Sequence, residues 1–307
     1  MTFGLFFEQF LNGLQFGCML FLMSAGLTLI FGVMGLINLA HGSFYMVGAF
    51  SAAAVAAAFG SFWLSLLASL IFASLAGVIV EIFVIRRLYN RDHLDQVLVT
   101  FALILFFSES VRWIFGAYPL YLDVPKILSG SIQIVDGIYY SKYRLFIIGV
   151  GSLLAMFLFL LIGKTNLGVQ IRAGQHDREM IAALGVDISR LYTFLFGIGA
   201  ALAGLAGALV GTIQSVEVGM GEPVLILAFV VIVIGGIGSM KGAFLASLLV
   251  GCVDTIGRFL MPWLVGKLTD PSIAMSIGSA IASMLIYILM AIVLIVRPTG
   301  LFGKDPA

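Results

Sequence analysis

Long apolar runs separated by short polar stretches extend along almost the whole chain. A helix needs about 20 predominantly apolar residues to cross a bilayer. The polar connections, the longest at about 116–142 and 164–189, are too short to hold a separate hydrophobic core. The pattern therefore predicts an all-α polytopic membrane protein with about eight membrane segments in a single membrane domain, residues 1–307. The predicted spans are 10–33, 39–59, 62–85, 97–116, 143–163, 190–213, a long apolar field at 223–256, and 273–296.

The first apolar run is followed directly by helix-breaking and polar residues. A helix break within a bilayer leaves backbone groups that lipid cannot satisfy, so such breaks occur only where protein or a water-filled cavity surrounds them. We therefore predict a discontinuity at 35–43 that faces the path of a transported solute. The residues that interrupt the run are Gly32, Gly35, Asn38, His41, Gly42 and Ser43.

The distribution of Lys and Arg predicts how the chain is oriented, because short cytoplasmic loops are enriched in these residues. Ten of the 16 basic residues fall on one side, including those that follow the third span and those at 164–190. Placing this side in the cytoplasm predicts a cytoplasmic C-terminus. The field at 223–256 must then begin and end outside, so it has to turn back on itself.

The turning point predicted for this field is residues 235–242, which hold three glycines in four positions followed by Lys241. This second Gly-interrupted segment lies in the C-terminal half, as the first lies in the N-terminal half. Paired breaks of this kind are typical of repeat-built transporters, whose solute path lies at the breaks. We therefore expect discontinuous or re-entrant helices in both halves and an inverted repeat. The predicted path residues are Asn38, His41, Gly42, Ser43, Tyr45, Gly235, Gly236 and Gly238.

Asn38 and His41 allow two interpretations. In the structural one, their side chains bond to backbone groups that the neighbouring glycines leave free. In the functional one, they line the path, since polar groups deep in a membrane protein commonly mark solute and ion pathways. A proton relay through His41 is disfavoured, because no second ionisable residue stands near it in the sequence.

Composition agrees with a membrane protein. Apolar residues make up 62% of the 307 positions and charged residues 10%, whereas soluble domains have roughly 45–50% and about 25%. The N-terminus lacks the basic region and cleavage site of a signal peptide, so we expect the first helix to be retained. A net charge of +1 predicts no nucleic-acid partner, and Cys18 and Cys252 have no metal-ligand or disulfide pattern.

Small and charged residues recur at helical spacing in three other spans. A stripe of small residues within 190–213 predicts a face for close helix packing. Two acid–base pairs, Glu109 with Arg112 and Asp254 with Arg258, are spaced to pair on a helix surface, and we interpret them as structural. The stripe consists of Gly199, Ala203, Gly207 and Gly211.

The polar segment at 164–190 predicts a short amphipathic helix over 175–184, with Gly185 as its end. Met180, Ile181 and Leu184 form an apolar side, and the first residues are polar. Such a helix either lies on lipid headgroups or docks in the groove of a partner protein. The small apolar side favours the partner.

Nothing in the chain predicts a nucleotide site or an active site. Gly163-Lys164-Thr165 is not a phosphate-binding loop, because that motif requires a glycine five residues before the one at 163, where Leu158 stands. We therefore expect no cofactor and no catalytic residues. Any ATP must be bound by partner subunits.

Five segments in the same order resemble the permease subunits of branched-chain amino acid ABC importers, and most of all the first of that system's two permeases. The resemblance extends over about 10–303. The segments are Gly-Leu-Thr-Leu-Ile-Phe-Gly-Val-Met-Gly-Leu-Ile-Asn-Leu-Ala-His-Gly (26–42), Lys-Thr-Asn-Leu-Gly (164–168), Ala-Ala-Leu-Gly-Val-Asp (182–187), Gly-Gly-Ile-Gly-Ser (235–239) and Arg-Pro-Thr-Gly-Leu-Phe-Gly (297–303).

The resemblance implies a bacterial inner-membrane subunit that pairs with a second, homologous permease. It also implies two cytoplasmic ATPases and a periplasmic solute-binding protein as partners. The short helix of 164–190 then corresponds to the coupling helix that docks on an ATPase. Its implied contact residues are Gln175, Asp177, Glu179, Ala182, Ala183 and Gly185.

Hydrophobic amino acids are the solutes that the resemblance favours. The family also includes permeases for urea, short amides and aromatic acids. A different class, the ion-coupled secondary transporters, requires ion ligands or a proton relay deep in the membrane. The ionisable residues here lie near span ends instead, which disfavours that class.

Overall fold

The computed structural model describes residues 3–89, 91–135, 137–175 and 177–303. Its long helices are α1 (Phe3–Met34), α2 (His41–Phe59), α3 (Phe62–Phe83), α4 (His93–Phe115), α5 (Lys142–Lys164), α8 (Ile188–Val210), α10 (Met240–Val265) and α11 (Pro271–Val296). The shorter helices are α6 (Asn166–Gly174), α7 (Arg178–Ala183) and α9 (Gly221–Gly235), with 3-10 turns at Ile85–Leu88 and Lys126–Leu128.

Eight helices of the described chain are long and apolar enough to cross a membrane, so this is a multi-pass membrane protein. The predicted apolar field at 223–256 is divided between α9 and α10, and α10 continues to Val265, beyond the predicted end. At 1.5 Å per residue, α9 is about 22 Å long, which is shorter than the ~30 Å hydrocarbon core of a bilayer.

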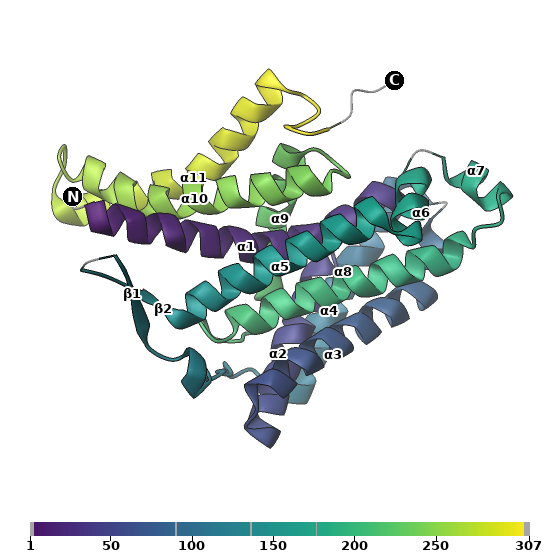
Figure 1. Cartoon of the computed structure of the whole chain (residues 1–307), viewed down its shortest axis with the longest axis horizontal. Helices are drawn as coiled ribbons and strands as arrows, with labels where there is room; N and C mark the ends of the chain where they lie inside the picture. Colours follow the sequence, from purple (N-terminus) through teal and green to yellow (C-terminus); the bar gives the residue numbers. More distant parts are fainter. Residues whose placement is uncertain (1–2, 90, 136, 176, 304–307) are drawn as a thin grey trace.

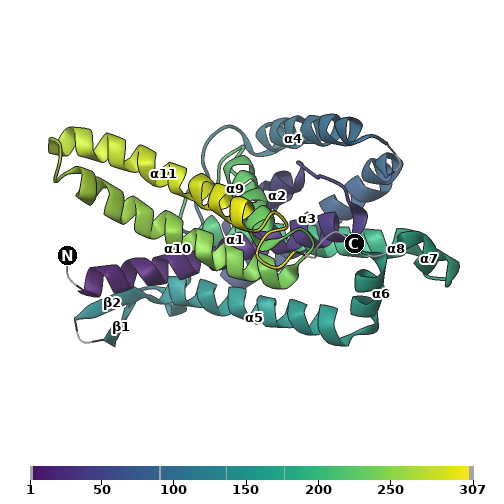
Figure 2. The same cartoon turned by 90° about the horizontal axis from the view of Figure 1, so that it is seen from above.

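Helices α1 and α8 form the centre of the molecule. In their most apolar windows 83% and 78% of residues are buried, compared with 17% in α4 and in α11. Figure 1 shows α1 running between α10 and the pair α5 and α8. In Figure 2, α10 and α11 extend to the left together with the N-terminal part of α1. Residues on α1 and α8 are therefore enclosed by protein, whereas α4 and α11 keep most of their side chains on the outside.

The connection at 116–142 contains two short antiparallel strands that the sequence analysis did not predict. They are β1 (Ser131–Val135) and β2 (Ile138–Ser141), with Ser131 opposite Ser141. The hairpin lies near the N-terminus of α1, where Ile138 approaches Gly4. Apart from this hairpin and one isolated bridge between Leu120 and Val216, the regular structure of the described residues is helical.

Candidate functional site

The chain leaves the helical conformation between α1 and α2, as the glycines and polar residues of 35–43 predict. Gly35 has a φ of +65°, a conformation that favours glycine. Asn38 then closes a tight turn, in which its Oδ1 accepts the N–H of Ala40 at 3.0 Å. The backbone carbonyl of Asn38 also accepts the N–H of His41 at 3.3 Å. The helical conformation resumes at His41, so the chain does leave the helix as predicted, but the break ends at residue 40, three residues earlier than predicted.

His41 is fully buried at the start of α2. Its Nε2 lies 3.2 Å from the carbonyl oxygen of Met23, which is in the middle part of α1. Because a carbonyl can only accept, Nε2 carries the proton in this hydrogen bond and Nδ1 keeps a free lone pair. Nδ1 has no hydrogen-bond partner among the described residues. The imidazole therefore ties α2 to α1 and keeps one acceptor unused.

Unpartnered buried polar atoms are concentrated around this break. Five buried side-chain atoms have no hydrogen-bond partner among the described residues, and three of them belong to Thr28, Asn38 and His41. Buried polar groups in native proteins are nearly always hydrogen-bonded, so each exception requires an explanation. Two of these atoms, Nδ2 of Asn38 and Nδ1 of His41, belong to residues of the break itself, and their hydrogen-bonding capacity is not used within the described residues.

Close glycine contacts hold the start of α2 in place. A Cβ atom on Gly42 would lie only 2.7 Å from the carbonyl oxygen of Gly221, the first residue of α9. A Cβ atom on Gly26 would lie 2.5 Å from the carbonyl oxygen of Gly199 on α8 and 2.9 Å from Nε2 of His41. Four helices, α1, α2, α8 and α9, therefore meet at backbone-to-backbone distance around His41.

The second break separates α9 from α10. Gly236 and Gly238 have φ values of +98° and +77°, and Ser239 caps α10 by accepting the N–H of Gly242 at 3.1 Å. The C-terminal segment closes over this break, because the N–H of Phe302 donates to the carbonyl of Gly235 at 3.0 Å. The predicted turning point at 235–242 is therefore the place where the helix is interrupted.

The structure does not bring all eight predicted path residues together. The first five, Asn38 to Tyr45, lie at the start of α2, whereas Gly235, Gly236 and Gly238 lie between α9 and α10. The end of α1, just before the first break, contacts the second break, since a Cβ on Gly32 would be 2.8 Å from the Cα of Gly238. Met23, Gly26 and Gly221, which also lie at the first break, were not among the predicted path residues. Of these, Gly221 had a detectable signal, since the proline two residues later marks a helix start.

All four small residues of the stripe on α8 are buried in close contacts or in the core. A Cβ on Gly199 would lie 3.0 Å from the carbonyl oxygen of Gly26, and one on Gly207 would overlap the backbone of Tyr45. Gly199 therefore faces α1 and Gly207 faces α2, whereas Gly211, which follows the last residue of α8, faces Leu122 and Val216. Its members are Gly199, Ala203, Gly207 and Gly211.

The segment 164–190 contains two short helices, α6 and α7, rather than the single helix predicted over 175–184. Asp177 begins α7, because its Oδ1 accepts the N–H groups of Glu179 and Met180 at 3.0 and 2.9 Å. Gly185, with a φ of +88°, follows the end of α7 as predicted. The difference arises because an aspartate side chain that caps a helix must lie outside it.

Gln175 belongs to the end of α6 and not to the predicted helix. Its N–H donates to the carbonyl of Ile171 at 3.1 Å, which continues the α6 hydrogen-bond pattern. Its amide nitrogen lies near Gly32 and Gly238, so this side chain faces the second break instead of the surface of α7.

The apolar side predicted for the short helix is divided. Ile181 is buried with 5% exposure, whereas Met180 and Leu184 are 58% and 76% exposed. Glu179, Ala182 and Ala183 are also exposed. One apolar residue therefore anchors α7 to the rest of the chain, and the others leave an uncovered surface.

A buried carboxylate joins α3 to α8 near the turn that holds Arg86 and Arg87. Glu81 accepts hydrogen bonds from Arg86 at 2.9 Å, Tyr89 at 2.5 Å and Thr193 at 2.6 Å. Burial, together with the bond to Glu81, raises the pKa of the Tyr89 hydroxyl, and the bond to Glu81 also raises the pKa of Arg86. The carboxylate of Glu81 therefore has hydrogen-bond donors from within the protein, which favours a structural role.

The two acid–base pairs predicted from the sequence also form. Glu109 and Arg112 are 2.5 Å apart, and Asp254 and Arg258 are 2.9 Å apart.

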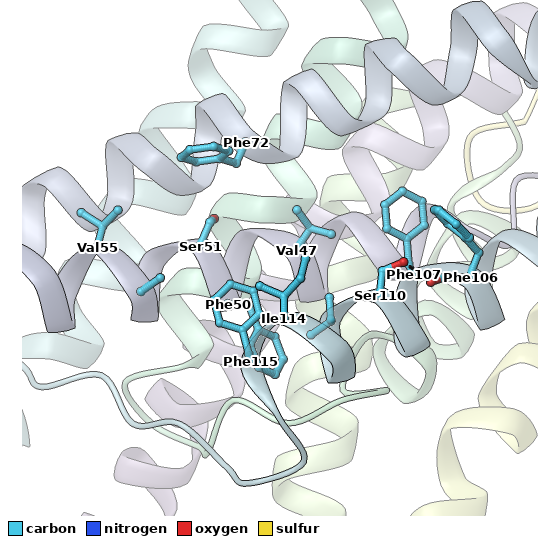
Figure 3. Close-up of a pocket in the computed structure, with 12 residues that line it drawn as sticks. Val47, Phe50, Ser51, Val55, Phe72, Phe106, Phe107, Ser110, Ile114 and Phe115 are labelled. Carbon is cyan, nitrogen blue, oxygen red and sulfur yellow. Dashed lines mark hydrogen bonds between the residues drawn. The ribbon is translucent and has the colours of Figure 1, made fainter.

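A groove of about 370 Å³ between α2, α3 and α4 is a poor candidate for a solute site. Figure 3 shows aromatic and aliphatic side chains, among them Phe50, Phe72 and Phe107, around it. Its two serines use their hydroxyl groups on their own helices, Ser51 at 3.0 Å to Gly48 and Ser110 at 2.7 Å to the carbonyl four residues before it. The groove therefore has no free polar group for an amino acid.

Comparison with known proteins gives a consistent result along the chain. The family model described as branched-chain amino acid transport system / permease component matches residues 9–294. The high-affinity branched-chain amino acid transport system permease protein BraD of Pseudomonas aeruginosa is 30% identical over 97% of this chain and 96% of its own length. The corresponding LivH proteins of Salmonella typhimurium and Escherichia coli are 27% and 26% identical over the same shares. No solved structure gives a significant match. With nearly its full length matched, the chain belongs to the family of branched-chain amino acid transport permeases, which carry no catalytic site and bind no cofactor of their own.

Proposed function

We propose that this chain is the membrane-spanning subunit of an ABC importer that carries hydrophobic, branched-chain amino acids into the cell. The names of the relatives support this solute class. The observation that carries the proposal is the buried first break, where Asn38 and His41 have polar atoms without hydrogen-bond partners among the residues that the structure describes. An amide N–H and an imidazole nitrogen can bond to the carboxylate and the ammonium group of an amino acid.

The two breaks form the gate of the path in this proposal. The first turns of α2 and α9 meet at Gly42 and Gly221, and helix N-termini carry a partial positive charge that suits a carboxylate. In repeat-built transporters, half-helix N-termini face anionic groups of the solute in this way. The short length of α9 and the break before α2 support discontinuous helices in an inverted repeat. Separation of these contacts would open the path.

Energy comes from partner subunits. A second homologous permease completes the membrane part, two cytoplasmic ATP-binding subunits drive it, and a periplasmic solute-binding protein delivers the amino acid. The exposed surface of α7, with Met180 and Leu184 uncovered, supports α7 as the coupling helix. ATP-driven closure of the two ATPases then moves α7, and this movement reaches the second break through α6 and Gln175.

The test is uptake of radiolabelled leucine by cells or proteoliposomes that contain the complete importer. Asn38→Ala and His41→Ala should each lower uptake about tenfold or more, because one good hydrogen bond to a charged group contributes roughly 1.5–3 kcal/mol. Tyr140→Phe is the matched control, since it also removes an unpartnered buried polar atom, but in β2. Unchanged uptake in both variants at normal expression would rule out the path assignment. Uptake that survives ATP depletion and stops with an uncoupler would instead indicate a secondary transporter.

A further inference from the structure

A second pocket, of about 390 Å³, lies between α1, α5, α6 and the break before α10. We call it the basic pocket, because Arg172 and Lys241 line it together with the polar residues Thr28, Gln175 and Ser239. Its lining residues on α5 and α6 belong to the region where these two helices meet, which Figures 1 and 2 show at one end of the molecule. No acidic residue lines the pocket.

The two cations of the basic pocket lack a carboxylate partner within the described chain. The four ion pairs of the described chain involve other arginines and include neither Arg172 nor Lys241. Arg172 donates to the carbonyl of Ile162, which uses one N–H group of a guanidinium that has five. Among the described residues Lys241 forms neither an ion pair nor a side-chain hydrogen bond, and it lies in the first turn of α10, whose N-terminus adds partial positive charge. The pocket therefore has an unbalanced positive charge.

Two hydroxyl groups that can donate hydrogen bonds lie beside these cations in the pocket. Thr28 is 1% exposed, and its hydroxyl has no hydrogen-bond partner among the described residues although it lines the pocket. Ser239 uses its oxygen to accept the N–H of Gly242, which leaves its hydroxyl proton free to donate. Leu29, Phe159 and Ile162 form an apolar wall beside these polar groups.

We propose that the basic pocket binds the phosphate group of an anionic membrane lipid, with one acyl chain along the apolar wall. A phosphate has several acceptor oxygens and matches the guanidinium, ammonium and hydroxyl donors of this pocket. The apolar wall beside the cations favours a lipid over a small soluble anion, because an acyl chain can cover these apolar side chains. Basic pockets between membrane helices on the cytoplasmic side bind anionic headgroups in this way. The bound headgroup joins α6, through Arg172, to the start of α10, through Lys241.

The test is lipid binding to the full chain in mild detergent after removal of bound lipid. Native mass spectrometry compares phosphatidylglycerol with phosphatidylcholine of the same acyl chains. The wild-type chain should retain phosphatidylglycerol preferentially. Each basic residue near the headgroup is worth roughly fivefold in affinity, so the variant with Arg172→Gln and Lys241→Gln should bind it about 25-fold more weakly.

Three further samples make the result specific. Lys126→Gln, which removes an exposed cation far from the pocket, should bind like the wild-type chain, and Arg172→Lys should retain most of the affinity. If the double variant does not fold, Lys241→Gln alone should lower affinity about fivefold. Equal binding of both lipids, or undiminished binding by the double variant, would overturn the proposal. Displacement of the lipid by millimolar inorganic phosphate would also overturn it, because the ligand would then be a soluble anion.

Discussion

At the scale of single residues, close helix packing in the centre of this protein depends on glycines, which have no side chain to separate the backbones. Gly48 and Gly204 approach each other so closely that a Cβ atom on either would overlap its neighbours. Gly42 and Gly221 are in the same situation at the starts of α2 and α9. In a membrane, where lipid is as apolar as the helix surfaces, such close packing is what holds helices together.

Gly42→Ala should therefore destabilise the protein. The added methyl group would lie 2.7 Å from the carbonyl oxygen of Gly221 and 3.3 Å from the Cβ of Leu225, and overpacking of this kind costs about 1–3 kcal/mol. We expect a lower thermal midpoint in detergent and a larger aggregated fraction on size exclusion.

Gly149→Ala is the matched control for this substitution. Gly149 is also helical, but a Cβ atom there would have nothing within 4 Å. Alanine should therefore be neutral or stabilise by up to about 1 kcal/mol. Equal midpoints for Gly42→Ala and the wild-type chain would show that α2 and α9 do not pack as described.

At the scale of elements, α7 differs from the other helices. It has six residues and is held mainly by Ile181, whose side chain approaches Gly174 at the end of α6. Such a short helix has little stability of its own, so its capping residue Asp177 and this contact hold it in place. The remaining surface is available to a partner.

Glu179→Arg should weaken docking of the partner ATPase on α7 and therefore lower the ATPase activity of the importer. Glu179 is exposed in the first turn of α7, so the isolated chain should fold normally. A reversed charge at the centre of a docking surface typically costs several kcal/mol through repulsion and desolvation. Solute-stimulated ATPase activity of the assembled importer should then fall at least tenfold.

The control for this substitution is Asp123→Arg, which reverses an exposed acidic residue in the connection before β1. It should leave ATPase activity and complex formation unchanged. Full activity of the Glu179→Arg complex would exclude α7 as the coupling helix.

At the scale of the whole molecule, the two ends of the helix bundle carry different loops. The hairpin β1–β2 and the connection at 211–220 lie at one end, whereas α6, α7 and the loop with Arg86 and Arg87 lie at the other. The excess of Lys and Arg at the second end predicts that it is cytoplasmic.

Cysteine labelling in intact cells tests this orientation. Cys18 is buried and Cys252 is partly buried, so both are first replaced by serine or alanine. A cysteine at Asp123 should react with a membrane-impermeant maleimide from outside. A cysteine at Ala183 should react only after the membrane is permeabilised, and the opposite result would reverse the proposed topology.

Much of the fold was predictable because the membrane imposes strong constraints on the sequence. The lengths of apolar runs located seven of the eight long helices, whereas the field predicted at 223–256 is divided between α9 and the first part of α10. Glycines at 35 and 235–238 marked both breaks. The strands β1 and β2 were missed because two four- or five-residue strands leave little periodicity to detect. The limits of α7 were missed because Asp177 fits equally well inside a polar helix start and as its cap.

The sequence by itself determined the class of the protein, its helices and the places where they break, since each depends on local composition and on the cost of unsatisfied backbone groups in lipid. Only the tertiary structure decided which atoms face each break. Met23 receives the hydrogen bond of His41, Gly221 lies against Gly42, and Gln175 faces Gly238. These contacts join positions far apart in the chain, and they depend on how whole helices pack, which no local pattern encodes.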